Sequence, residues 1–240
     1  MAENYILLER TELNASAASV TFANIPQTGY TDLKIVMSTR LDSASGANFN
    51  TIKFNGSSSG FTVRSLEGSG SSASSFSTSL NYGGLDEGTS FTSNTFSSTE
   101  IYIPNYNSAN NKSYSVETVT ENNATSAFME MVAGLWSNTA AITSIQITPD
   151  TGGRNYVANS TFSLYGIAAL GTTPTIAPKA DGGNVIATDG TYWYHAFLSS
   201  GTFTPQVGLN ADVLVIAGGG GGLESAGGGA KLLRTRPTWR

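Results

Sequence analysis

The sequence predicts an all-β protein, a jelly-roll-like β-sandwich followed by a short β and glycine-rich C-terminal element. Three observations support this fold class. Short segments in which apolar and polar residues alternate recur along the chain, as in half-buried strands. Gly, Pro, Asn and Asp separate these segments and supply turns. Helical spacing of apolar residues persists nowhere, and many short strands without helices indicate a sandwich or barrel.

The first half of the chain contains short expected strands at residues 4–10, 18–24, 32–40, 49–55 and 61–66. Pro26 and Gly29 form a turn between the second and third, and Asn55-Gly56 is a strong signal for a tight turn after the fourth. The Gly/Ser-rich stretch 69–79 is expected to be a flexible surface loop. Strands at 96–104, 112–121 and 161–167 complete the sandwich around a central segment.

That central segment, residues 126–149, is the most apolar stretch of its length and is expected to be the core hairpin. One face of its first strand carries Met129, Met131, Ala133 and Leu135, and the other carries Phe128, Val132 and Trp136. Apolar residues on both faces predict a strand covered on both sides, with Trp136 buried. The second strand, 143–148, alternates and is expected to be half-exposed, with Ile145 and Ile147 inward.

Composition shifts divide the chain into three parts. Residues 1–168 are expected to form the sandwich domain, and 169–182, with two prolines and little apolar content, a linker. Residues 183–240 are expected to form a small β element with a glycine-rich segment and a basic tail. Its strands are predicted at 185–186, 191–198 and 213–217.

Charge and cysteine content limit the function classes. The chain has 17 acidic and 12 basic residues, and four of the basic ones, Lys231, Arg234, Arg236 and Arg240, lie at its end. The remaining acidic body does not suit nucleic-acid binding, which requires phosphate neutralisation. There is no cysteine, so disulfides and cysteine metal sites are excluded. No apolar run is long enough for membrane insertion.

Several motifs together resemble structural proteins of tailed bacteriophages. They are PQTGYTDLKIV, EIYIPNY, GLWSNTAAITSIQITP, FSLYGI and DGTYWYHAF…SGTFTP…ADVLVIAGGGGG. The chain is similar to virion proteins of the tail fibre or tail protein type, as found in marine phages. In that family the glycine run opens a longer glycine-rich domain, whereas this chain ends in AKLLRTRPTWR.

The resemblance implies a virion protein that is assembled in the host cytoplasm and takes part in host attachment without being an enzyme. Its expected partners are other virion proteins and further copies of itself, with a trimer formed through residues 183–222. Two alternatives remain open. One is a capsid decoration or head-fibre protein, and the other is a carbohydrate-binding module that recognises a host surface glycan.

The residues themselves nominate no catalytic, cofactor or metal site. His195 is the only histidine, and the glycine run fails the dinucleotide spacing at Leu223. Asp42 and the pair Asp86-Glu87 fall in expected loops and offer oxygen ligands for Ca²⁺, but no loop with alternating Asp and Asn accompanies them.

Two groups of residues are binding candidates. Five aromatics suit contacts with a glycan or a partner, and equally suit a core or a subunit interface: Tyr102, Tyr106, Tyr192, Trp193 and Tyr194. A docking segment is expected near the end of the chain, at Val213, Val215, Gly218, Gly220, Arg234 and Arg236. Its apolar strand needs cover on both faces, and its glycines permit close backbone approach. A frayed, solvated tail is the alternative.

Overall fold

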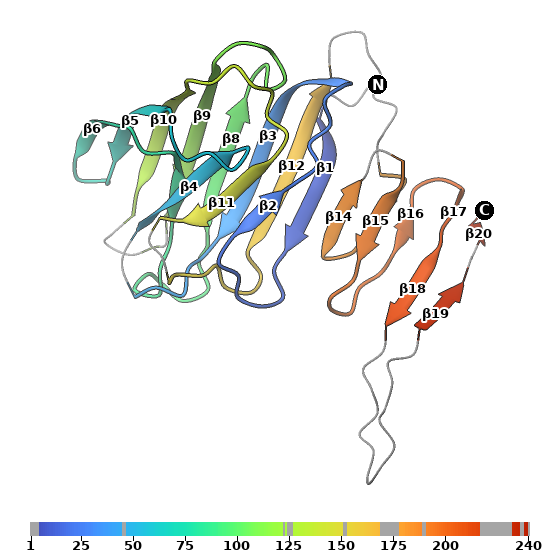
Figure 1. The fold of residues 1–240 in the computed structure, drawn as a ribbon. Coiled ribbons are helices and arrows are strands. Elements are labelled where there is room, and N and C mark those ends of the chain that lie inside the picture. Colours follow the sequence, from blue (N-terminus) through green and yellow to red (C-terminus); the bar gives the residue numbers. More distant parts are fainter. Residues whose placement is uncertain are drawn as a thin grey trace, which may run out of the picture. The chain divides into compact units, whose positions relative to one another are not determined.

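The computed structural model describes residues 5–44, 47–121, 123, 127–150, 153–168, 178–188, 191–216, 232–235 and 238–239 (Figure 1). This part of the chain consists of antiparallel strands and contains no helix, so the predicted all-β class is confirmed. Contacts between residues divide the chain into two compact units. The first comprises residues 1–177 and 183–201, and the second comprises 178–182 and 202–240.

The first unit is a two-sheet structure. Its large sheet has ten strands in the order β15-β14-β1-β12-β3-β8-β9-β10-β5-β6, and its small sheet has four in the order β2-β11-β4-β7. The strands of the large sheet are β15 (Trp193–Ala196), β14 (Val185–Thr188), β1 (Tyr5–Glu12), β12 (Thr161–Ala168), β3 (Tyr30–Thr39), β8 (Ser97–Ile103), β9 (Lys112–Val119), β10 (Met129–Trp136), β5 (Phe61–Gly68) and β6 (Ala73–Thr78). Those of the small sheet are β2 (Val20–Phe22), β11 (Ile145–Pro149), β4 (Asn48–Phe54) and β7 (Tyr82–Asp86).

The core lies between these two sheets. Figure 1 shows β2, β4 and β11 crossing one face of the large sheet. At one end of the core, the Phe54 ring of the small sheet lies 5.4 Å from the Trp136 ring and 5.8 Å from the Tyr114 ring, centroid to centroid. Both contacts are edge-on, an arrangement that favours the ring quadrupoles. Trp136 is 1% exposed, and its Nε1 donates a hydrogen bond to the Ser59 carbonyl at 3.2 Å, which confirms the predicted burial.

The expected core hairpin at 126–149 is wrong. β10 pairs with β9 and β5 in the large sheet, whereas β11 pairs with β2 and β4 in the small one. Residues 137–144 therefore cross between sheets instead of turning back. The crossover is held by Ile142, whose N–H donates to the Tyr106 carbonyl at 2.9 Å and whose carbonyl accepts from Gln27 Nε2 at 2.9 Å.

Only one face of β10 is covered, so the prediction of cover on both sides is also wrong. Val132 and Trp136 are buried, whereas Met129 and Met131 are 58% and 53% exposed. The small sheet covers the first face alone. The prediction for the second strand is confirmed, because alternate residues of β11 are buried, Ile145 and Ile147 among them.

The Gly/Ser-rich stretch is not a loop as predicted, because most of it forms β6. Ser69 N–H donates to the Ser72 carbonyl at 3.0 Å, and Gly70 has φ +81°. A positive φ at the first central residue is what a type II′ hairpin turn requires. The glycine therefore makes a tight hairpin between β5 and β6. β7 was not predicted, since its sequence YGGLD does not alternate and all five residues are buried.

The predicted boundary at residue 183 does not coincide with the division by contacts. β14 pairs with β1, through Arg10 opposite Ile186 and Thr11 opposite Val185, and β15 pairs with β14. These two strands therefore extend the large sheet, and Ile186 is buried. Residues 169–177 of the expected linker lie outside the described residues.

The second unit contains three two-stranded ribbons. β13 (Ala180–Asp181) pairs with β16 (Thr204–Pro205), β17 (Leu209–Asn210) with β20 (Thr238–Trp239), and β18 (Val213–Ile216) with β19 (Leu232–Thr235). All four side chains of β18 are exposed. The predicted strand at 213–217 is thus present.

Replacing Trp136 with alanine removes the largest fully buried side chain and leaves a cavity beside Phe54 and Phe61. We expect the free energy of unfolding to fall by about 3–5 kcal/mol in urea denaturation. Met131→Ala, on the uncovered face of the same strand, is the control and is expected to change it by less than about 0.5 kcal/mol. Equal stability of Trp136→Ala and the wild type would contradict the assigned core.

Candidate functional site

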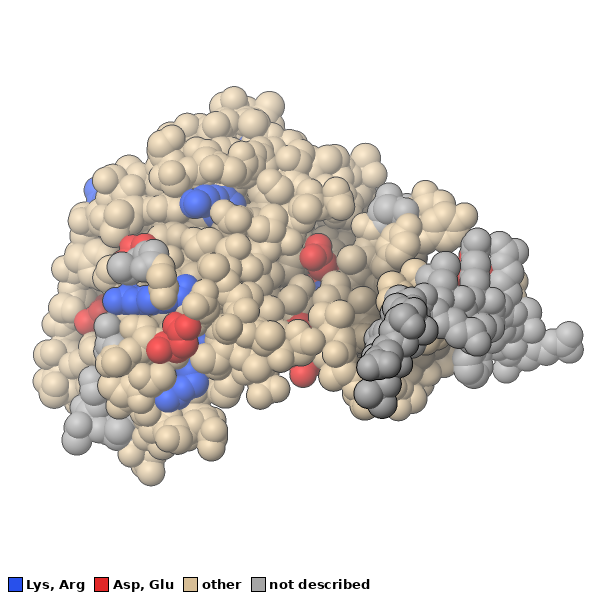
Figure 2. Space-filling model, turned by 60° about the horizontal axis from the view of Figure 1, so that its bottom comes forward, with Lys and Arg blue, Asp and Glu red and all other residues tan. Residues whose placement is uncertain are grey.

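The face of the large sheet opposite the small sheet is the candidate functional surface, and we call it the outer face. Exposure alternates strictly along β8 and β9, and nearly so along β10 and β5, so every second side chain points to this face. Strand register places these side chains in cross-strand rows. The residues that define it are Lys34, Leu66, Arg64, Glu100, Tyr102, Ser115, Glu117, Val119, Met129, Met131, Ala133 and Tyr165. Four of them, Lys34, Arg64, Glu100 and Glu117, are charged. Elsewhere on the molecule, the view in Figure 2 shows charged residues only in small groups.

Four large apolar side chains form a contiguous group on the outer face, which we call the methionine patch. Met129 lies opposite Val119, and Met131 lies opposite Leu66. Their exposed fractions are 58% for Met129, 39% for Val119, 53% for Met131 and 57% for Leu66. Shallow hollows lie over this group, bordered by Arg64 and Glu117 among others. A contiguous exposed apolar group with a polar border is typical of an interaction surface.

A second group on the outer face, the tyrosine platform, surrounds Lys34. Tyr165 of β12 and Tyr102 of β8 lie directly opposite Lys34 on its two neighbouring strands. The Tyr5 ring lies with its centroid 5.6 Å from Lys34 Nζ, within the range of a cation–π contact. Tyr5 is 53% and Tyr102 is 37% exposed. The platform therefore presents tyrosine rings around a single ammonium group.

Polar partners fix the geometry of the platform. Lys34 Nζ forms an ion pair with Glu100 at 2.6 Å, and this carboxylate raises the pKa of Lys34. Tyr102 Oη donates to Asp32 Oδ2 at 2.7 Å, and the Asn105 N–H donates to Asp32 Oδ1 at 2.9 Å. The hydrogen bond to Asp32, with burial as a smaller cause, raises the pKa of Tyr102 to about 12. Both side chains thus keep their protons at neutral pH, and their positions are set by neighbouring strands.

The five aromatics expected at a binding site do not come together. Tyr102 lies on the tyrosine platform, but Tyr106 is fully buried and donates a hydrogen bond to the Pro26 carbonyl. Tyr106 therefore belongs to the core. Tyr192 and Tyr194 are exposed and Trp193 is half-buried, at or beside β15. Four strands lie between β15 and β8 in the sheet order, so these residues and Tyr102 do not share one site.

The expected docking segment is described only in part. Val213 and Val215 lie on β18 and are 37% and 48% exposed. Gly218, Gly220 and Arg236 lie outside the described residues. The Arg234 backbone pairs with Leu214, and its side chain lies outside the described set.

Sequence reasoning missed most of this surface. Tyr5 and Tyr165 lie in strands that were predicted, at the alternate positions that point away from the core. The sequence does not indicate that β12 lies between β1 and β3, because β12 is far from both strands along the chain. The sequence places Met129 and Met131 on one face of a strand, but it predicts that this face is covered, whereas both side chains are exposed.

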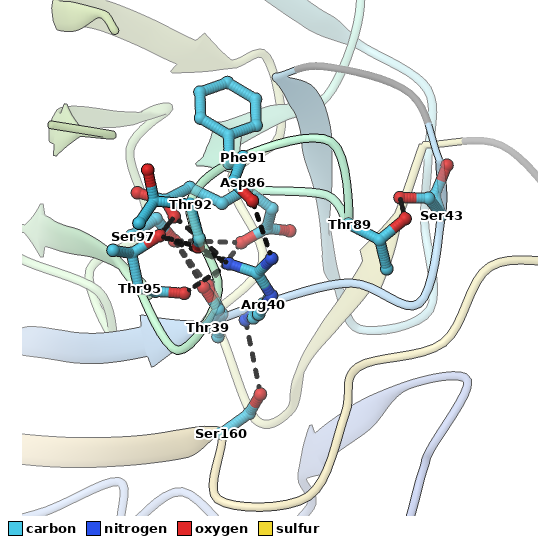
Figure 3. A network of polar contacts seen from close by, with 11 residues as sticks. Thr39, Arg40, Ser43, Asp86, Thr89, Phe91, Thr92, Thr95, Ser97 and Ser160 are labelled. Atoms are coloured by element: carbon cyan, nitrogen blue, oxygen red, sulfur yellow. Dashed lines mark hydrogen bonds and ion pairs between the residues drawn. The ribbon is translucent and has the colours of Figure 1, made fainter. Parts of the chain in front are cut away.

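A buried polar network closes one end of the sandwich (Figure 3). Arg40 follows β3, and its guanidinium donates to three carbonyls of the loop after β7: Phe91 at 3.2 Å, Thr92 at 2.9 Å and Thr95 at 2.7 Å. The same group lies 3.5 Å from Glu87 Oε2. This loop is therefore fastened to the end of β3 by one cation.

The sequence predicts an open loop at Asp86-Glu87, and this prediction is wrong. Asp86 ends β7, and both residues belong to this buried network. Both residues are fully buried. The hydroxyls of Thr39 and Ser97 donate to Asp86 Oδ1, while Asp86 Oδ2 and Glu87 Oε1 have no hydrogen-bond partner among the described residues. Asp42 instead is exposed and accepts two hydrogen bonds from Asn155. Within the described ranges, no group of three or more acidic or histidine side chains could hold a metal ion.

Burial sets the protonation of these carboxyl groups. It raises the pKa of Asp86 to about 6, against the hydrogen bonds from Thr39 and Ser97 that favour the charged form. Burial also raises the pKa of Glu87 and of Glu130, which accepts hydrogen bonds from Ser65 and Tyr82 in the core. The interior therefore contains carboxyl groups that bind protons more tightly than they do in the unfolded chain.

The raised pKa of Asp86 predicts a dependence of stability on pH. A carboxyl group that binds protons more tightly in the folded state stabilises the fold fully below its unfolded pKa, near 3.8, and loses that contribution as pH rises through about 6. The free energy of unfolding should therefore fall between these values, by about 3 kcal/mol for this group. Urea denaturation across this pH range should show a shallower fall for Asp86→Asn.

Asp42→Asn is the control for this measurement. The hydrogen bonds from Asn155 lower the pKa of Asp42, so its contribution is present above its unfolded pKa and is lost as pH falls. Removing Asp42 should leave the fall in stability with rising pH in place. If Asp86→Asn keeps the full wild-type slope, the assignment of that slope to Asp86 is wrong.

No family model, curated protein or solved structure matches this chain. In the described part of the chain, no helix is long and apolar enough to cross a membrane.

Proposed function

We propose that this protein is a non-enzymatic structural component of a tailed-bacteriophage virion, a tail fibre or tail-associated protein that takes part in host attachment. The observation that carries the proposal is the open outer face with its methionine patch. The resemblance of the sequence motifs to phage tail proteins supplies the virion context. In this proposal the chain is assembled into the particle in the host cytoplasm and acts by binding.

The methionine patch suits docking against another virion protein. Its four side chains project from three adjacent strands, so a partner can cover them together. Methionine side chains are flexible and polarizable and adapt to irregular partner surfaces. Glu117 and Arg64, of opposite charge, lie beside the patch and give the partner a defined orientation.

The second unit supports self-association as well. Val213, Leu214, Val215 and Ile216 are all exposed, with fractions from 37% to 72%. A two-stranded ribbon such as β18–β19 has too little surface of its own to bury them. Contact between copies in this region would supply the missing cover, as expected for a trimer formed through residues 183–222.

The tyrosine platform favours glycan recognition as a second candidate function. Exposed tyrosine rings present flat apolar faces on which sugar rings stack, and their hydroxyls stay polar. Lys34, Glu100 and Asp32 offer donors and acceptors for sugar hydroxyls beside those rings. A carbohydrate-binding role in host recognition would use this part of the outer face and leave the methionine patch for assembly.

Electron microscopy of purified particles labelled with an antibody to this chain tests the proposed function. Label on the tail supports a tail fibre or tail-associated protein. Label on the head would favour the capsid decoration or head-fibre alternative, and the absence of the chain from particles would reject both.

Placing a charge in the methionine patch should prevent docking. Met131 is 53% exposed, so Met131→Lys should leave the melting temperature nearly unchanged. A residue at the centre of an interface contributes about 2 kcal/mol, so incorporation into particles, or affinity for the docking partner, should fall about thirtyfold.

Thr21→Lys is the matched control for this prediction. Thr21 is exposed on β2 of the small sheet and receives the same charge away from the outer face. Normal incorporation is expected for Thr21→Lys. Normal incorporation of Met131→Lys as well would contradict the role of the patch.

Glycan arrays test the second candidate. If the platform binds a glycan, Tyr5→Ala and Tyr102→Ala should each weaken binding about tenfold, because each removes one stacking surface. Tyr192→Ala is the control, since that exposed tyrosine lies at the β15 end of the sheet. Retention of every bound glycan by both platform variants would exclude this site, whichever glycans the protein binds.

A further inference from the structure

β6 forms one edge of the large sheet. It pairs with β5 on one side, and in the described part of the chain no strand pairs with its other side. Figure 1 shows it at the margin of the sheet. Ala73, Ser74, Ser75 and Ser77 are exposed. An edge of this kind presents a row of backbone donors and acceptors to the surroundings.

The hairpin turn determines which backbone groups face outward. The hydrogen bond from Ser69 N–H to the Ser72 carbonyl fixes the alternation of bonded and non-bonded pairs along β5 and β6. It makes Ser74 with Glu67, and Phe76 with Ser65, bonded pairs. The N–H and C=O groups of the alternate residues Ala73, Ser75 and Ser77 therefore point away from β5.

The usual protections of an edge strand are missing from β6. Natural proteins block such edges with charged side chains, proline, bulges or a covering segment. The sequence from Gly68 to Leu85 contains no charged residue and no proline. The register between β5 and β6 is unbroken along all six residues of β6. This strand is built as an edge that accepts another strand.

We propose that the free edge of β6 pairs with β6 of a second copy of this chain, antiparallel and about a twofold axis at Ser75. In this register Ser75 lies opposite Ser75 of the partner copy. Ala73 of each copy lies opposite Ser77 of the other copy. All three outward-pointing residues then form bonded pairs, which other twofold registers do not achieve. The two large sheets become one continuous sheet.

Electrostatics favours a second copy at this edge. Two copies of a chain with net charge −5 repel one another, and the repulsion is smallest where charge is absent. A twofold axis places identical residues near one another, so a charged edge strand would oppose itself. In the proposed register the nearest charged residues, Arg64 and Glu67 of β5, lie opposite uncharged residues of the partner copy. This interface is independent of the proposed virion role and of the 183–222 region.

A single introduced cysteine tests the pairing directly, because the chain has no cysteine of its own. In a bonded antiparallel pair the two Cα atoms lie about 5.5 Å apart, within the span of about 4.4–6.8 Å that a disulfide bridges. Under a mild oxidant, Ser75→Cys should give a covalent dimer on non-reducing gels. Ser115→Cys, exposed on the outer face at β9, is the matched control and should stay largely monomeric.

Analytical ultracentrifugation of the full chain completes the test. Ser75→Pro removes an N–H that faces the free edge, a position where an edge strand tolerates proline. Its far-ultraviolet circular dichroism should match the wild type, while the mass of its assembly should fall by half, because only the β6 contact is lost. Ser75→Thr keeps the N–H and should keep the dimer. A wild-type monomer at high micromolar concentration, or an oligomer unaffected by Ser75→Pro and not cross-linked by Ser75→Cys, would overturn the proposal.

Discussion

The packing of the small sheet against one face of the large sheet is the interaction on which the rest of the structure depends. It buries alternate residues of the large sheet, and the edge-on contacts of Phe54 with Trp136 and Tyr114 join the two sheets at one end. The small sheet covers one face of the large sheet, and on the opposite face most of the described side chains of β8, β9 and β10 remain exposed. The outer face, with its methionine patch and tyrosine platform, exists because the sandwich is asymmetric.

Buried polar side chains connect segments of the sandwich through hydrogen bonds, in addition to the apolar packing of the two sheets. Arg40 fastens the long loop after β7, and Glu130 joins β10 to β7 through Tyr82 and to β5 through Ser65. Such groups are costly to bury unless they are hydrogen-bonded. The carboxyl groups reduce that cost by binding protons more tightly, which couples the interior of the protein to the pH outside.

Features that depend on residues close together in the sequence could be predicted, whereas features that depend on pairing between distant strands could not. β4, β8, β9 and β12 were predicted closely because one-sided burial leaves an alternating pattern in the sequence itself. β6 and β7 were missed because serine-rich and glycine-rich strands do not alternate in hydropathy. The expected hairpin failed because Ser137-Asn138-Thr139 indicates only that the chain bends, and the sheet it enters next depends on distant partners. The tyrosine platform depends on the same non-local pairing, so only Tyr102 was nominated.

The position of β1 has a consequence for synthesis on the ribosome. Its two neighbours in the sheet are β12 and β14, which begin at Thr161 and Val185. At roughly 5–20 residues per second, β1 waits about eight to thirty seconds before its first partner is made. β8, β9, β10 and β5 can pair meanwhile, since all four precede residue 137. β1 thus waits for partners that are made long after it, and a chain cut short before β12 leaves both β1 and one side of β3 without a neighbour.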